Sequence, residues 1–216
     1  MRTVVYVDGF NLYYRALRKS KHKWLNLHSL CEASLPKACN IVAINYYTAR
    51  VSGSRNPTAP KDQNTYLKAL GTLPNLRIHF GNFQVTNTWM PLAHPFRFWP
   101  VGVAPFPVPE SVCAIKTEEK GSDVNLGAHL VRDAFCGAFE HAVVVTNDTD
   151  LKEPLRLVVE DAKLPLTLLT PTNNPAITLR GLATDVRHLG PYLGVSQFRD
   201  PLIGTNGSPI LKPADW

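Results

Sequence analysis

The sequence predicts an α/β fold with a central, mostly parallel sheet. Short β-branched apolar runs alternate along the chain with segments whose apolar residues recur at helical spacing. This alternation is typical of parallel strands joined by helical crossovers. The apolar runs at 3–7 and 142–145 are followed by polar residues that include aspartate. Such endings place acidic side chains at the carboxyl edge of the sheet, where open α/β sheets bind ligands.

The predicted elements follow one another in a regular order. The expected strands are residues 3–7, 41–47, 76–80, 142–146 and 166–169, with a further strand around 112–116 at an edge. The expected helices are residues 12–19, 27–35, 61–70, 122–136, 151–162 and 177–183. Gly9 permits the sharp turn after the first strand. We expect one domain over 1–190, followed by a tail over 191–216 without a clear pattern.

Composition describes a globular protein of 216 residues, of which 44% are hydrophobic and 19% charged. The net charge of +6 and the pI of about 9.2 are a weak indication of a polyanionic partner. The first residues run directly into a strand, so we expect no signal peptide. No apolar run reaches the roughly 18 residues of a membrane span. We therefore expect a cytoplasmic protein with no membrane association.

The four cysteines show neither metal-knuckle spacing nor a dense disulfide framework. Reduced thiols agree with a cytoplasmic location. Cys113 and Cys136 lie in apolar contexts, which predicts that both are buried.

The segment 81–110 breaks the alternation of strands and helices. It contains six of the 18 prolines together with several aromatic residues. A disordered linker would have fewer aromatic residues. We interpret the segment as an insertion that packs on the domain, on a protein partner or on a second copy of the chain.

Acidic residues follow several predicted elements at the same edge of the sheet. Asp8 follows the first strand, Asp123 opens the predicted helix 122–136, and Asp148 follows the strand 142–146. Helix capping could explain Asp8, and a favourable helix dipole could explain Asp123. Asp150 with Glu153 has the spacing of a capping box, which leaves Asp148 unexplained. Converging carboxylates predict a site for Mg²⁺ or Mn²⁺.

Five blocks of the sequence resemble the NYN domain family of the PIN-like ribonuclease superfamily. They are residues 5–11 (VYVDGFN), 47–50 (YTAR), 63–70 (QNTYLKAL), 120–124 (KGSDV) and 145–150 (VTNDTD). The resemblance covers residues 1–190 and implies a PIN-like three-layer α/β/α sandwich with a metal-dependent nuclease site. The family's catalytic residues correspond here to Asp8, Asp123, Asp148 and Asp150, with Asn11 in support. Two departures are Asn147 in place of a glycine, and His129 where the middle helix often carries a second acid.

The resulting hypothesis is a ribonuclease that hydrolyses RNA phosphodiesters and leaves 5′-phosphate and 3′-hydroxyl ends. Asp8, Asp123 and Asp148 would hold one or two Mg²⁺ or Mn²⁺ ions, which neutralise the phosphate and activate water. Asn11 would orient a ligand or the scissile phosphate. Further substrate or supporting contacts are expected from Thr146, Asn147 and Thr149.

The RNA backbone is expected to follow the loop after the second strand, because this loop leaves the same edge as the acids. The basic residues predicted to contact it are Arg50, Arg55 and Lys61. A second basic cluster lies further along the first helix, and we expect it to be remote from Asp8 and to contribute little. That cluster is Arg15, Arg18, Lys19, Lys21 and Lys23.

Three other functions fit parts of the sequence. The main alternative is an RNA-binding or scaffold protein with a degenerate nuclease site. An aspartyl phosphatase with Asp8 as nucleophile is disfavoured by Phe10, which stands where a second aspartate is expected. A dinucleotide-binding enzyme is disfavoured because no G-x-G-x-x-G motif follows the first strand.

Overall fold

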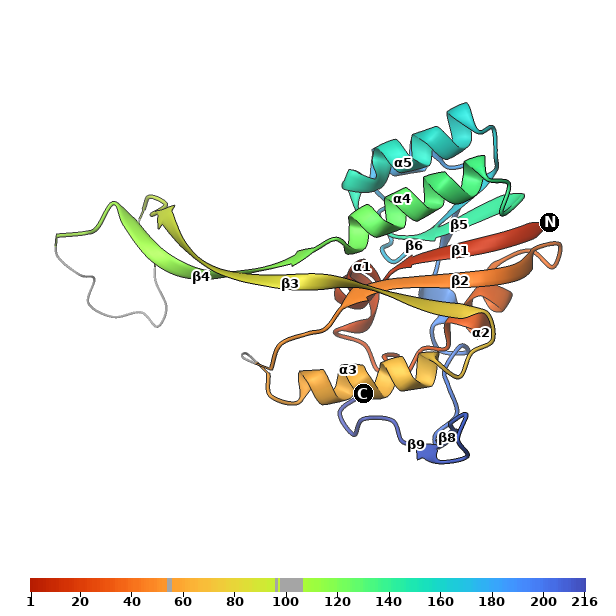
Figure 1. Cartoon of the computed structure of the whole chain (residues 1–216), viewed down its shortest axis with the longest axis horizontal. Coiled ribbons are helices and arrows are strands. Elements are labelled where there is room, and N and C mark those ends of the chain that lie inside the picture. Colours follow the sequence, from red (N-terminus) through yellow and green to blue (C-terminus); the bar gives the residue numbers. More distant parts are fainter. Residues whose placement is uncertain (54–55, 96, 98–106) are drawn as a thin grey trace.

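The computed structural model describes residues 1–53, 56–95, 97 and 107–216. Within this part, seven strands form one sheet in the order β4-β3-β2-β1-β5-β6-β7. Neighbouring strands are parallel, except for the antiparallel pair β3 and β4. Helices α4 and α5 cover one face of the sheet, and α2 and α3 lie on the other (Figure 1). The predicted α/β class, with a three-layer arrangement and a mostly parallel sheet, is confirmed.

The bounds of the elements agree with most of the predicted ranges. The strands are β1 Arg2–Asp8, β2 Asn40–Ala49, β3 Leu76–Pro91, β4 Ser111–Lys120, β5 His141–Val145, β6 Leu166–Thr170 and β7 Asp185–His188, with a small hairpin of β8 Leu202–Ile203 and β9 Pro209–Ile210. The α-helices are α1 Gly9–Leu12, α2 Leu27–Ser34, α3 Ala59–Leu70, α4 Ser122–Phe135, α5 Lys152–Arg156 and α6 Ile177–Leu182. Short 3₁₀ turns at Thr149–Leu151 and Gly190–Tyr192, and π-helical segments at Tyr13–Leu17 and Leu157–Asp161, complete the helical part.

The centre of the sheet is formed by β1 and β5, which pair in parallel register. Every residue of β5 is buried, as are the residues of β1 after Arg2. Successive side chains alternate between two apolar clusters, so that Val5 faces the α2 and α3 side and Tyr6 faces the α4 side. The unbroken β-branched runs are therefore explained by burial on both faces of the sheet.

Residues 81–91 of the segment predicted as an insertion continue β3. This strand runs on to Pro91 and pairs with β4 from Asn82↔Lys120 to Pro91↔Ser111. The two strands form a ribbon that projects far from the body of the molecule (Figure 1), and we call residues 82–91 and 111–120 the arm. Trp89 on the arm is 72% exposed, so its ring does not pack on the domain; packing on a protein partner or on a second copy of the chain stays a prediction. Residues 96 and 98–106 lie outside the described residues.

One further expectation about the surface is wrong. Cys113 and Cys136 are exposed rather than buried, because Cys113 lies on the arm and Cys136 follows the last turn of α4. The C-terminal tail packs against the core, where the ring of Trp216 lies 5.6 Å from that of Tyr66 and Phe198 is buried. None of the described helices is long and apolar enough to cross a membrane.

Gly9 lies where the chain turns from β1 into α1 and passes close to β2. A Cβ atom at this position would lie 2.6 Å from the carbonyl oxygen of Tyr47 and 2.6 Å from the ring of Tyr46. The carbonyl belongs to a buried strand and cannot move aside without distorting the sheet. The absence of a side chain at Gly9 therefore allows Asp8 to be placed at the end of β1.

We expect Gly9→Ala to lower the free energy of unfolding by about 1–3 kcal/mol or more, through overpacking. Chemical denaturation at neutral pH measures this loss. Gly181→Ala is the matched control, because Gly181 lies in α6 and a Cβ there meets nothing within 4 Å. Equal stabilities of the two variants would contradict the close approach of Gly9 to β2.

Candidate functional site

A pocket of about 580 Å³ lies at the carboxyl ends of β1 and β5, and Phe83 and Glu119 of the arm also line it. Its lining residues are Asp8, Phe10, Asn11, Tyr14, Arg15, Arg18, Lys19, Phe83, Glu119, Ser122, Asp123 and Asp148. The structure thus brings together Asp8, Asn11, Asp123 and Asp148, as expected from acids at the carboxyl edge of a parallel sheet. The remaining members of the lining were not predicted as site residues.

Asp8 forms the buried floor of the pocket, with an exposed fraction of 3%. Its Oδ1 atom accepts a hydrogen bond from the backbone N–H of Asn11 at 2.9 Å, which caps α1. Its Oδ2 atom accepts one from the hydroxyl of Thr146 at 3.0 Å. The pKa of Asp8 is raised to about 7, first by burial and then by the charges of Asp123 and Asp148, while the two hydrogen bonds act to lower it. Asp8 is therefore both a helix cap and a carboxylate crowded by two others.

Thr146 connects the end of β5 to Asp8 and to Asp148. Its Oγ1 atom donates to Asp8 and accepts a hydrogen bond from the backbone N–H of Asp148 at 3.1 Å. The hydroxyl is buried behind the acids rather than open to substrate, so it fixes the relative positions of two carboxylates. This agrees with the predicted supporting role for Thr146.

Asp148, and not Asp150, caps the helical turn after β5. The Oδ1 atom of Asp148 accepts a hydrogen bond from the backbone N–H of Asp150 at 3.0 Å. The predicted capping box of Asp150 and Glu153 is wrong, because the turn begins earlier than the sequence suggested and Glu153 pairs with Arg156. Asp150 and Thr149 are both exposed and are absent from the pocket lining.

Asn11 and Asn147 tie three loops together at the rim. The Oδ1 atom of Asn11 accepts a hydrogen bond from the backbone N–H of Asn147 at 2.9 Å. The Oδ1 atom of Asn147 accepts one from the backbone N–H of Ala176 at 2.8 Å, before α6. Asn147, which was predicted to contact substrate, therefore holds neighbouring segments together through these hydrogen bonds. Asn11 also lines the pocket.

Asp123 enters the pocket from the first turn of α4. Burial raises its pKa, and the charges of Asp148, Glu119 and Asp150 raise it further. Gly121 occupies the N-cap position of this helix, and its φ of 98° suits glycine. Ser122 is buried and its hydroxyl donates to Glu119 Oε2 at 2.7 Å. Glu119, at the end of β4, thus supports the start of α4 and adds a fourth carboxylate to the lining.

Carboxylate oxygens are the ligand type that a hard divalent cation prefers, but these side chains do not converge on one position. Within the described ranges, no group of three or more His, Cys, Asp or Glu side chains is arranged to hold a metal ion. Mg²⁺ commonly binds through one or two carboxylates and keeps several waters. The raised pKa values of Asp8 and Asp123 indicate uncompensated negative charge, which a cation would relieve. Negative charge of this kind is what a divalent cation with oxygen ligands neutralises, although the described side chains do not form a closed metal site.

The basic residues near the acids differ from those predicted. Arg15, Arg18 and Lys19 line the pocket, so the prediction that this part of the first helix lies far from Asp8 is wrong. The helical run from Phe10 places residues four apart on the face toward the pocket, and long side chains span the remaining distance. The same spacing of four residues explains why Phe10, Tyr14 and Arg18 lie on one side of the pocket.

Arg50 and Lys61, predicted to contact RNA, do not belong to the pocket lining. The guanidinium of Arg50 lies over the ring of Phe80, 4.6 Å from its centroid, and donates to Asn64 Oδ1 at 3.2 Å. Lys61 is exposed on α3. Arg55 lies outside the described residues.

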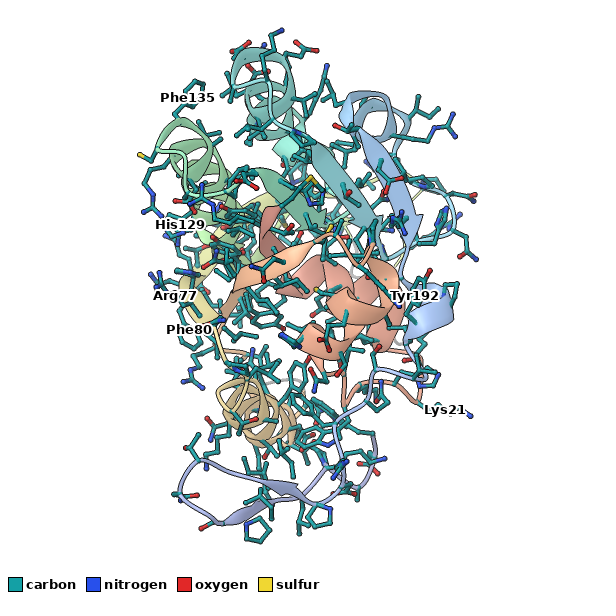
Figure 2. The ribbon with its side chains drawn as sticks, turned by 90° about the vertical axis from the view of Figure 1, so that its right-hand side faces the viewer. Lys21, Arg77, Phe80, His129, Phe135 and Tyr192 are labelled. Atoms are coloured by element: carbon teal, nitrogen blue, oxygen red, sulfur yellow. The ribbon has the colours of Figure 1, made fainter. Side chains whose placement is uncertain are left out.

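His129 lies on α4 away from the pocket, on the side of the body that carries Arg77 and Phe80 (Figure 2). Its Nδ1 atom is 3.0 Å from the hydroxyl of Tyr47, and its ring packs against that of His79 at 4.8 Å. Burial lowers the pKa of both histidines. His129 is therefore a helix-face residue that contacts the sheet.

The fold and the pocket define a three-layer α/β/α protein whose candidate site is an acidic crevice beyond the carboxyl ends of the central strands. No protein-family model matches the chain. The chain is 31% identical to the 6-hydroxy-3-succinoylpyridine 3-monooxygenase HspA of Pseudomonas putida (strain DSM 28022 / S16), over an alignment that spans all of this chain and 75% of that protein. The chain belongs to the family of this enzyme.

Among solved structures, the fold is similar to that of a protein of unknown function from Vibrio parahaemolyticus RIMD 2210633. The TM-score is 0.50 with 12% sequence identity, over 87% of this chain and 91% of that chain. A likeness at this identity concerns the fold alone.

Proposed function

We propose that this chain is a metal-dependent ribonuclease that hydrolyses RNA phosphodiesters in the acidic pocket. The observation that carries the proposal is the crowding of Asp123 and Asp148 around the buried Asp8, whose pKa is raised to about 7. Crowded carboxylates beside a cationic rim suit a substrate that brings both a divalent cation and a phosphate. The resemblance of five sequence blocks to the NYN domain family supports the same activity.

The residues of the chain have separate tasks in this proposal. Asp8, Asp123 and Asp148 would hold Mg²⁺ or Mn²⁺, which when bound neutralises phosphate charge and lowers the pKa of water. Thr146 keeps Asp8 and Asp148 in position through its two hydrogen bonds. The amino group of Asn11 can donate to a phosphate oxygen, as expected from the sequence.

Cleavage by purified protein tests the proposal. Labelled single-stranded and structured RNAs should be cut with Mn²⁺ or Mg²⁺, and cutting should stop with chelator. The products should carry 5′-phosphate and 3′-hydroxyl ends. RNA binding without cleavage under every metal condition would favour the scaffold alternative with a degenerate site.

We also expect millimolar Mg²⁺ or Mn²⁺ to raise the melting temperature of the wild type. An ion at ten times its dissociation constant stabilises by about 1.4 kcal/mol, which corresponds to roughly 3–5 °C for a chain of this size. Differential scanning fluorimetry measures the shift. The variant with Asp8, Asp123 and Asp148 all changed to Asn should lose it, and an equal shift in both proteins would place the ion elsewhere.

A second candidate is oxygenation of a small aromatic compound. It is favoured by membership of the HspA family, together with the aromatic side chains of Phe10, Tyr14 and Phe83 in a pocket of about 580 Å³. A substituted pyridine fits a pocket of this size and lining. Oxygen uptake and loss of 6-hydroxy-3-succinoylpyridine, in the presence of a reduced nicotinamide, test this candidate. An unchanged compound and no oxygen uptake would exclude it as the substrate.

A further inference from the structure

One wall of the pocket is aromatic, and it faces the acids from two different parts of the chain. Phe10 and Tyr14 lie one helical turn apart with near-parallel rings, at a centroid distance of 6.3 Å and an angle of 20°. Phe83, from the arm, meets Phe10 edge to face at 5.8 Å. The exposed fraction of Tyr14 is 57%, so its ring is open to a ligand.

Cationic side chains lie beside this wall. The guanidinium of Arg18 lies 5.6 Å from the centroid of the Tyr14 ring. Arg15 and Lys19 also line the pocket, and none of the ion pairs between described residues involves these three cations. The pocket therefore offers exposed aromatic surface at Tyr14, together with three cations that form no ion pair with another described residue, within one cavity.

The position of Phe83 is fixed by the junction between the arm and the body. Gly81 precedes it and packs so closely that a Cβ there would lie 2.7 Å from the carbonyl oxygen of Lys120. Glu119, across from Phe83 in the register, holds the start of α4 through Ser122. The aromatic wall and the Asp123 carboxylate are thus attached to the same junction.

We propose that this wall binds an unpaired nucleotide of the substrate strand. The base packs against Tyr14, Phe10 and Phe83, and the adjoining phosphates contact Arg15, Arg18 and Lys19. Aromatic rings stack on any exposed base face, whereas a paired base in a duplex has both faces covered by its neighbours. The inference rests on the proposed ribonuclease function and names its substrate as RNA with unpaired bases at the bound position.

The test measures RNA binding without cleavage, in chelator and in the Asp148→Asn background. A labelled single-stranded RNA is compared with the same strand made abasic at successive positions and with the same strand in a duplex. Stacking contributes roughly 5- to 150-fold in affinity per base. We therefore expect the abasic strand and the duplex each to bind at least about 5-fold more weakly.

Variants of the wall connect this preference to particular residues. Tyr14→Ala and Phe83→Leu should each weaken binding of the normal strand by at least about 5-fold and leave abasic binding unchanged. Phe83→Leu keeps an apolar side chain against Phe10 and so preserves the junction. Trp89→Ala is the matched control, since Trp89 is an exposed aromatic residue of the arm outside the pocket lining, and it should leave binding unchanged.

The phosphate contacts are tested through the salt dependence of binding. Each lost contact to a single strand should lower the slope of log affinity against log salt by about 0.7. The Arg15→Ala, Arg18→Ala double variant should therefore lower the slope by about 1.4. The Arg50→Ala, Lys61→Ala double variant, which alters cations outside the lining, should leave it unchanged.

Three results would overturn the inference: equal binding of normal and abasic strands, equal or tighter binding of the duplex, and no RNA binding at all. The ribonuclease proposal is judged separately from cleavage by the wild type with metal. Base-dependent binding without cleavage would keep the nucleotide site and remove the nuclease. Cleavage by the wild type without base-dependent binding would keep the nuclease and remove the nucleotide site.

Discussion

Asp148→Asn should abolish metal-dependent RNA cleavage and leave the metal-free fold almost unchanged. The side chain has two uses in the structure, as a carboxylate of the pocket and as the cap of the turn after β5. Asparagine retains the oxygen that accepts the hydrogen bond from Asp150 N–H, and it is as favourable a cap as aspartate. It removes the negative charge that the proposed cation needs.

We expect cleavage to fall by roughly 10³-fold, the upper end of the loss for one stabilising group at a developing charge. Initial rates with Mn²⁺ and melting curves in chelator measure the two effects. Asp150→Asn is the control, because Asp150 is exposed and outside the pocket lining. Normal turnover by Asp148→Asn would remove this residue from the mechanism. An equal loss of cleavage in Asp150→Asn would show that the active site extends beyond the lining residues of the pocket.

Asp8→Asn should make the metal-free protein more stable above neutral pH. Burial, followed by the charges of Asp123 and Asp148, raises the pKa of Asp8 from 3.8 to about 7 in the folded protein. Ionisation is therefore easier in the unfolded chain, so the wild type loses stability as the pH rises from about 4 to about 7. The gap between the two pKa values corresponds to about 4 kcal/mol.

Asparagine cannot ionise, and its Oδ1 atom can still accept the capping hydrogen bond from Asn11. The two proteins should thus have similar stability near pH 4 and differ most above pH 7, with the variant more stable. Urea denaturation in chelator across this range measures the difference. Millimolar Mg²⁺ should stabilise the wild type and narrow the gap. Parallel pH profiles of the two proteins would contradict a raised pKa at Asp8.

The acids of the pocket were predictable from their places in the chain. Asp8 and Asp148 follow buried apolar strands, and Asp123 lies in the first turn of a helix that connects two strands. In a parallel sheet, the carboxyl ends of the strands and the N-termini of the crossover helices share one edge, which places Asp8, Asp123 and Asp148 together, and the structure brings them into one pocket. The capping role of Asp148 was missed because Asp150 offered a familiar local spacing to Glu153. Helix boundaries set by hydrogen bonds of the backbone are poorly fixed by such spacing.

The aromatic and basic wall contained a signal that the sequence analysis did not use. Residues 10, 14 and 18, and residues 11, 15 and 19, recur at intervals of four from the end of the first strand. Side chains at this spacing share one face of a helix. Phe83 and Glu119 could not be found in this way, because their position depends on the pairing of β3 with β4. The arm was not predicted because prolines and aromatic residues within and between its two strands obscure the alternating pattern of a strand.

The central place of β1 in the sheet has a consequence for how the chain is synthesised. One edge of β1 pairs with β2, which starts at Asn40, but the other pairs with β5, which starts at His141. At about 5–20 residues per second, β5 leaves the ribosome on the order of ten seconds after β1. During this time an apolar strand has an unpaired edge, which is a template for aggregation. We therefore expect nascent chains of this protein to depend on chaperones until β5 emerges, and no nascent chain shorter than residue 148 can form the acidic pocket.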